Sequence, residues 1–119
     1  RDVLVRLNRE HPGLPLHVAE SGCAFADQPG DDGIVHDASR IAYHKAHLAS
    51  VAEAIEAGAN VRSYHAWSLY DNFEWASVYR PRFGMVQVDY ATQQRTIKDS
   101  ATWYRELCHA ARARQYQGV

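Results

Sequence analysis

Long apolar runs and an excess of charge of either sign are both missing from this sequence of 119 residues. No run approaches the roughly 20 apolar residues that a membrane-spanning helix needs, and the first residues lack the charged and hydrophobic regions of a signal peptide. With 13 basic and 14 acidic residues, the formal net charge is -1. We therefore expect a soluble, unprocessed chain that binds neither nucleic acid nor a membrane.

Cysteine is also scarce, since only Cys23 and Cys108 occur, far apart and without CxxC spacing. Two such cysteines do not indicate a disulfide framework, so we expect free thiols in a reducing compartment. His44 and His47 lie three residues apart on a predicted helix, but no further ligand completes a metal-binding pattern. The sequence predicts neither metal nor cofactor, and frequent arginine and alanine suggest a bacterial, cytoplasmic protein.

The composition is that of a globular protein, with 46% hydrophobic and 23% charged residues. Helix-like and strand-like patterns alternate along the chain. The predicted elements are a helix ending at Pro12, a strand over 14–20, a surface loop over 27–37, a helix over 38–57, a strand over 61–67, a hairpin around 91–93 and a last helix capped by Ser100.

The long central helix has a predicted cap at each end. Asp37 or Ser39 is suited to its N-terminus, and Gly58 stands where a C-terminal cap is expected. Its apolar face is predicted from the residues that recur at helical spacing, namely Ile41, Leu48, Ala52 and Ile55.

Strands that alternate with helices predict an α/β fold with parallel strands and crossover helices. Two such strands are too few for a closed barrel or a stable open sheet. The fold therefore needs further strands from a missing partner segment.

The stretch "WSLYDNFEWASVYRPRFG", residues 67–84, combines six aromatic rings with the acids Asp71 and Glu74. Aromatic faces beside carboxylates suit sugars, which stack their C–H faces on indole and donate hydrogen bonds to acids. An aromatic cluster that covers the end of a barrel explains the same composition equally well. Asp71 and Asn72 are also suited to bracing the loop through bonds to the backbone.

Glu20 ends the first predicted strand in "HVAESGCAF". Taken alone, a loop glutamate is more often a solvated charge than a catalytic group. In barrels of alternating strands and helices, however, the active site lies at the carboxyl ends of the strands. Glu20 and the loop after Trp67 both fall at that end.

Three stretches resemble the C-terminal part of glycoside hydrolase family 1, the group of β-glucosidases and β-galactosidases. They are "LPLHVAESG", "DGIVHDASRIAYHKAHL" and "WSLYDNFEWASVYRPRFGMVQVDYATQQRTIKDSATWY". The resemblance runs from about Leu14 to Ala111, and "WSLYDNFEW" followed by "RFGMVQVDY" is its most specific part.

The resemblance implies a (β/α)8 TIM barrel, of which this chain holds about two βα units and a small hairpin. It also implies that Glu20 is the catalytic nucleophile, which forms a covalent glycosyl-enzyme with retention. The implied substrate-binding residues are Trp67, Glu74, Trp75 and Phe83, which would stack on the sugar, bind its outer hydroxyls, add an indole N–H and wall the pocket. The same resemblance implies a cis peptide bond between Trp67 and Ser68.

Some residues depart from the family pattern. Ser21 stands where asparagine is usual, and Val78 where glycine is common. The Thr-x-Asn-Glu-Pro stretch that carries the family's acid/base glutamate does not occur in this chain. We further expect Arg82 to pair with Glu20 or another acid and keep it ionised.

We therefore expect residues 1–119 to be a C-terminal fragment of a single TIM-barrel domain. The expected activity of the complete protein is that of a retaining β-glucosidase acting on a β-glucoside or short β-linked oligosaccharide, with galactosyl substrates also open. The fragment alone is expected to be inactive without the missing N-terminal barrel segment. The alternative is a non-catalytic, sugar-binding or structural remnant of the same fold.

Overall fold

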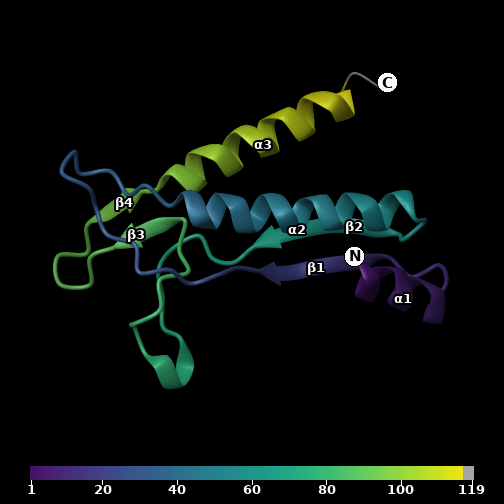
Figure 1. Ribbon diagram of the computed structural model, residues 1–119, viewed down its shortest axis with the longest axis horizontal. Helices are drawn as coiled ribbons and strands as arrows, with labels where there is room; N and C mark the ends of the chain where they lie inside the picture. The colour runs from purple at the N-terminus through teal and green to yellow at the C-terminus, as the bar shows by residue number, and fades with distance from the viewer. Residues whose placement is uncertain (117–119) are drawn as a thin grey trace.

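The computed structural model describes residues 1–116. Every predicted helix and strand is present, with boundaries within a few residues of those expected from the sequence (Figure 1). The elements are α1 (Asp2–Glu10), β1 (Leu16–Ser21), α2 (Ala38–Glu56), β2 (Val61–Ala66), the 3-10 turn η1 (Trp75–Ser77), β3 (Val86–Val88), β4 (Arg95–Ile97) and α3 (Asp99–Tyr116).

β1 and β2 form a parallel pair joined by the crossover helix α2, as the alternation of patterns predicted. The pairing begins at Leu16 with Val61 and reaches Ser21 with Ala66. Register irregularities interrupt it along the way. Both strands end at the same edge, from which the loop over 67–84 projects (Figure 1).

The C-terminal end of α2 is closed as the sequence predicted. The Gly58 N–H donates to the Ile55 carbonyl and the Ala59 N–H donates to the Ala54 carbonyl, both at 2.9 Å. Gly58 has a φ of 92°, which a residue without a side chain adopts at little cost. This paired hydrogen bonding turns the chain from the helix into β2.

The predicted apolar face of α2 is only partly correct. Ile41 and Leu48 are half-buried, whereas Ala52 and Ile55 are exposed. The fully buried residues on α2 are Arg40, His44 and Ala54. Periodicity of apolar residues located the helix, but it missed the buried side because ionic and hydrogen-bonded partners satisfy two polar residues there.

The predicted surface loop over 27–37 and the two predicted N-caps also need correction. Asp27, Val35 and Asp37 are buried. Asp37 occupies the N-cap position of α2, but its carboxylate makes no capping bond and accepts hydrogen bonds from Arg40 and Ser100 instead. Ser100 lies inside α3, one residue after its start, so its hydroxyl serves Asp37 rather than capping the helix.

The buried apolar side chains gather mainly beyond the carboxyl ends of the parallel strands. β3 and β4 form the predicted antiparallel hairpin, in which Val86 and Val88 are buried, as are the preceding Met85 and the distant Val35. Val86 bridges Tyr70 of the loop, and Val35 bridges Lys98 after the hairpin. By contrast, no residue of β1 or β2 is fully buried. Within residues 1–116, no helix is both long and apolar enough to cross a membrane.

Candidate active site

Glu20 lies at the carboxyl end of β1 with an exposed side chain. Within the described residues, no side chain pairs with its carboxylate, so both oxygens remain available. Glu20 borders a cavity of about 500 Å³ lined by α1, β1, α2 and Tyr64 of β2. The neighbouring Ser21 hydroxyl lies 3.5 Å from the Tyr43 hydroxyl, which places a polar pair beside this strand end.

Gly22, the residue after β1, packs against the backbone of Trp67, the residue after β2. The Trp67 N–H donates to the Ser21 carbonyl at 2.7 Å. A Cβ atom at position 22 would overlap the Trp67 carbonyl oxygen. The glycine is therefore required by close approach of two backbones, and it keeps Glu20 and Trp67 at the ends of adjacent strands.

Trp67 and Glu74 are in direct contact. The Trp67 indole N–H donates to Glu74 Oε1 at 3.3 Å, and both side chains are half-buried. The structure therefore brings together two of the residues expected to bind sugar. It also confirms the predicted cis peptide bond between Trp67 and Ser68.

Trp75 and Phe83 occupy different parts of the same loop. Trp75 begins the turn η1 and is 84% exposed. Phe83 is half-buried, and its carbonyl accepts hydrogen bonds from the Ser68 N–H at 3.3 Å and from Arg40 at 3.2 Å. Among the described residues, neither ring stacks on Trp67, so the structure shows no direct contact among these three expected sugar-binding rings.

Val78 has a backbone conformation that favours glycine, the residue that is common at this position in the family that the sequence resembles. Val78 has φ 56° and ψ -119°, a conformation that costs a β-branched residue free energy. The Val78 carbonyl accepts a hydrogen bond from the Glu74 N–H at 2.6 Å. The strained backbone at Val78 is thus part of the turn that holds Glu74.

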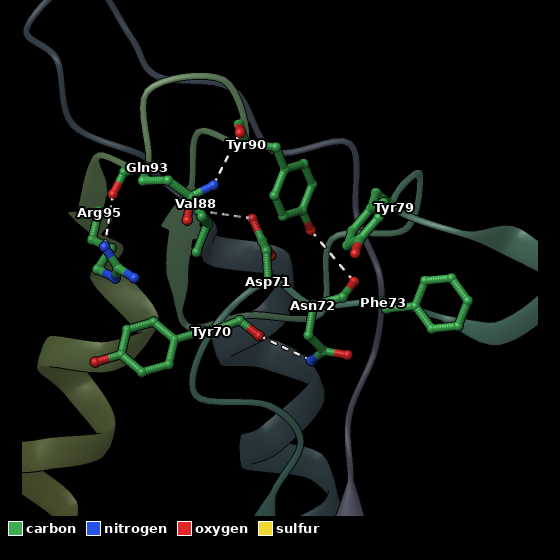
Figure 2. A pocket seen from close by; sticks show the side chains of 9 residues that line it. All are labelled: Tyr70, Asp71, Asn72, Phe73, Tyr79, Val88, Tyr90, Gln93 and Arg95. Atoms are coloured by element: carbon green, nitrogen blue, oxygen red, sulfur yellow. Dashed lines mark hydrogen bonds between the residues drawn. The ribbon is translucent and has the colours of Figure 1, made fainter.

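A second cavity of about 560 Å³ lies between the loop and the hairpin (Figure 2). The rings of Phe73, Tyr79 and Tyr90 pack along it, with centroids 5.5 and 4.7 Å apart. These rings form an aromatic cluster, but Phe73 and Tyr79 are exposed, so the expected core over a barrel end stays a prediction. Two polar side chains at the cavity donate hydrogen bonds to nearby backbone carbonyls, Asn72 to Tyr70 in the loop and Gln93 to Tyr90 in the hairpin turn. These bonds stabilise the local backbone.

Asp71 closes the base of the loop. Its carboxylate accepts hydrogen bonds from the Gly84 N–H at 2.9 Å and from Arg82 at 3.1 Å. It also accepts one from the Val88 N–H at 3.3 Å (Figure 2). The predicted bracing by Asp71 is confirmed, as is the Asn72 bond to the Tyr70 carbonyl. Arg82 pairs with Asp71, so the acid that it holds is not Glu20.

Sequence reasoning missed a buried ionic network behind this loop. Its cations are Arg40, Lys98 and the partly buried Arg82, and its acids are Asp27, Asp37 and Asp71. Arg40 is 0% exposed and also donates to the carbonyls of Cys23, Arg82 and Phe83. The available signal was the Asp37 and Arg40 pair at the helix start, spaced three apart like a helical ion pair.

Cysteine and histidine side chains have other roles. Cys23 and Cys108 are both free, as expected, and burial raises the pKa of the Cys23 thiol, which disfavours the thiolate. His44 Nδ1 lies 2.8 Å from the Tyr64 hydroxyl, and burial lowers the pKa of His44. His47 instead pairs with the Tyr43 carbonyl at 2.9 Å. Of the acidic side chains that the structure describes, only Glu20 combines a position at the end of a parallel strand with a carboxylate that has no recorded partner.

Comparisons with known proteins agree on one family. The family described as Glycosyl hydrolase family 1 matches residues 1–113. A bifunctional β-D-glucosidase/β-D-fucosidase from Bifidobacterium breve is 52% identical over 117 residues, which cover 93% of this chain and 25% of the relative. A 6-phospho-β-galactosidase from Streptococcus equi subsp. zooepidemicus is 42% identical, over 89% of this chain and 23% of the relative.

A solved structure gives the same result. The family 1 β-glucosidase from Thermotoga maritima in complex with isofagomine lactam superposes with a TM-score of 0.88 at 44% identity, over 90% of this chain and 24% of that chain. This chain therefore spans about a quarter of the length of the relatives that it matches.

Proposed function

This chain belongs to glycosyl hydrolase family 1 and has the fold of the C-terminal part of its (β/α)8 barrel, and on that premise we propose that it carries the nucleophile of a retaining β-glucosidase. The proposed substrates of the complete enzyme are terminal β-D-glucosyl residues, with β-galactosyl residues as a second choice. The observation that carries the proposal is the free carboxylate of Glu20 at a strand end whose next residue, Ser21, accepts a backbone hydrogen bond from Trp67, the residue whose indole binds Glu74.

The proposed chemistry proceeds in two displacements. A Glu20 oxygen bonds to the anomeric carbon while the bond from that carbon to the leaving-group oxygen breaks, and an acid elsewhere in the complete enzyme protonates that oxygen. Water then attacks the anomeric carbon, releases Glu20 and returns its proton to the same acid/base group. The exposed position at a rigid strand end suits Glu20 to this role because the carboxylate needs little reorganisation.

The other side chains bind the sugar in this proposal. The indole of Trp67 offers an apolar face to the C–H side of the ring, and its N–H orients Glu74. Glu74 accepts hydrogen bonds from the hydroxyls farthest from the anomeric carbon, at positions 4 and 6. Trp75 and Phe83 complete the pocket when the sugar and the rest of the barrel are present.

A phosphorylated sugar is a second candidate, because one relative is a 6-phospho-β-galactosidase. The Glu74 carboxylate disfavours it, since a 6-phosphate would bring a like charge to the same place. Among the side chains of residues 1–113, no basic group forms an ion pair with Glu74. We expect the complete enzyme to hydrolyse an aryl β-glucoside faster than its 6-phosphate, and the reverse preference would contradict the assignment of the substrate.

Covalent labelling tests the role of Glu20. We expect 2-deoxy-2-fluoro-β-D-glucosyl fluoride to inactivate the complete enzyme and to label Glu20, as read by peptide mass spectrometry. Replacement Glu20→Ala should lower turnover by at least about 10³-fold. Azide should restore turnover of Glu20→Ala and yield the α-glucosyl azide, because it attacks from the face that Glu20 occupied.

The control for this test is Glu56→Gln, an exposed acid at the end of α2, which should retain full activity. Sugar binding without covalent labelling would instead support the non-catalytic alternative.

We also propose that the 119 residues alone do not hydrolyse glycosides. A retaining pair needs two carboxyl groups about 5 to 5.5 Å apart, and this chain lacks the stretch that carries the second. An assay of the separate 119-residue chain on 4-nitrophenyl β-D-glucoside checks this. Turnover comparable with that of the complete enzyme would contradict the proposal.

A further inference from the structure

We propose that Lys98 is a positioning residue for the loop over 67–84 and thereby sets the preference of the enzyme for sugars that carry the 4- and 6-hydroxyls. The inference rests on the proposed function and extends it to a residue outside the sugar site. Lys98 precedes α3 and is separated from the loop by the hairpin. Among the side chains that the structure describes, its recorded ionic partners are Asp27 and Asp71, neither of which we expect to contact the sugar.

The Lys98 ammonium group is held between two acids. Its Nζ donates to Asp27 Oδ2 at 2.6 Å and lies 3.6 Å from Asp71 Oδ1. The residue is 1% exposed, so water does not screen these charges. The Lys98 N–H also donates to the Met85 carbonyl at 3.0 Å, which fixes its backbone to the start of the hairpin.

Asp71 connects Lys98 to the loop over 67–84, because its carboxylate lies near Lys98 and also accepts hydrogen bonds from loop residues. The same Asp71 oxygen that faces Lys98 accepts the Gly84 N–H, while the other accepts Arg82 and the Val88 N–H. In Figure 2, Asp71 lies between Val88 of the hairpin and Tyr70, its neighbour in the loop over 67–84. Glu74 lies three residues after Asp71 in the same loop. We therefore expect the position and orientation of the Glu74 side chain to depend on the Asp71 bonds to Gly84, Arg82 and Val88.

Removal of the Lys98 charge takes away the cation that Asp27 and Asp71 share, while each acid keeps its arginine partner. Asp27 would keep Arg40 and Asp71 would keep Arg82, but the two buried carboxylates would face each other without the cation between them. Like charges at such a site repel or force one acid to bind a proton. Either response weakens the Asp71 bonds at the loop base and displaces Glu74 from its sugar hydroxyls.

The test compares substrates rather than absolute rates. In the complete enzyme, kcat/KM is measured for 4-nitrophenyl β-D-glucoside and for its 4-deoxy and 6-deoxy analogues. A hydrogen bond to a charged group supports a preference of at least about tenfold for the glucoside in the wild type. We expect Lys98→Met to reduce this preference to less than about threefold, while Lys45→Met, at an exposed site on α2, leaves it unchanged.

A merely structural role gives a different result. Loss of folded enzyme lowers kcat/KM for all three substrates by one factor, so an unchanged preference in Lys98→Met overturns the inference. If that variant does not fold, Asp71→Asn keeps the side-chain shape and removes the charge that Lys98 holds. The same fall in preference is expected there, and its absence overturns the inference equally.

The outcome is distinguishable from failure of the proposed function. A wild type that is neither active on these glycosides nor labelled at Glu20 refutes the function alone. The position of the loop is then read from the ¹⁹F signal of 5-fluorotryptophan at Trp67, whose indole binds Glu74. A shift of this signal in Lys98→Met, but not in Lys45→Met, supports the positioning role, and an unshifted signal overturns it.

Discussion

The parallel sheet and the network region beyond it bury their residues in opposite ways. The network region comprises the loops over 22–37 and 67–84, the hairpin β3–β4 and the adjoining ends of α2 and α3. In the sheet, no residue is fully buried, and polar side chains such as His17 and Ser63 pair on an open face. In the network region, charged groups are buried and paired within the chain.

This difference shows which part of the fold is complete in itself. The loop that carries Trp67 and Glu74 is held by contacts that all lie within this chain. The strand that carries Glu20 depends on one neighbouring strand and exposes its other edge. The loop that we propose to bind the sugar is therefore supported by contacts within the described residues, whereas Glu20, the proposed nucleophile, lies on a strand that lacks further sheet neighbours.

The largest expected effect comes from breaking the network at Arg40. Replacement Arg40→Met leaves Asp27 and Asp37 buried with too few cations, so we expect the free energy of unfolding of the complete enzyme to fall by about 3 to 5 kcal/mol. Urea unfolding measures this change. The matched control Arg62→Met, at an exposed position on β2, should change stability by less than about 0.5 kcal/mol. Equal losses in both variants would contradict the comparison.

A smaller effect is expected where the sheet enters the network. A methyl group in Gly22→Ala would overlap the Trp67 carbonyl and force the ends of β1 and β2 apart. Displacement of a reacting group by about 1 Å costs about 100-fold in rate, so kcat/KM should fall by about that factor.

The control for this variant is Gly33→Ala, because Gly33 has φ 75° and its Cβ would meet no atom within 4 Å. It should lose about 1 kcal/mol of stability from its backbone conformation and retain kcat/KM. Unchanged kcat/KM in Gly22→Ala would show that the two strand ends are not rigidly coupled.

The smallest expected effects are changes in stability with pH, which differ between the two regions. In the network region, the carboxylates of Asp99 and Asp32 raise the pKa of His36. Its contribution to stability is therefore complete below about pH 6.5 and is lost as pH rises through the raised value. Beneath the sheet, burial lowers the pKa of His44, so protonation in the unfolded state lowers stability as pH falls below about 6.5.

Urea midpoints between pH 5 and 8 measure both contributions. His36→Gln should remove a fall in stability above pH 6.5, and His44→Gln should remove a loss below it. The same sign of change in both variants would contradict the assignment of these environments. The effect at His36 should also weaken in high salt, because the group is exposed and its charges are screened.

Much of the fold followed from local pattern. Glycine and proline marked the ends of α1 and α2, apolar spacing located the helices, and alternation located β2. The apolar face of α2 did not follow, because periodicity assumes that buried positions are apolar. Arg40 and His44 violate that assumption through partners that lie far away in the sequence.

The candidate site divides in the same manner. The sequence alone determined that an acid ends the first parallel strand and that an aromatic, acidic loop follows the next, because strand and turn signals are local. Only the tertiary structure decided that Trp67 binds Glu74, that Arg82 serves Asp71 and that Lys98 lies between two acids. The first two pairings lie within one loop and the Lys98 pairs join separate segments, but none has the three- or four-residue spacing of a helical pair, and their free energy depends on burial that no local pattern encodes.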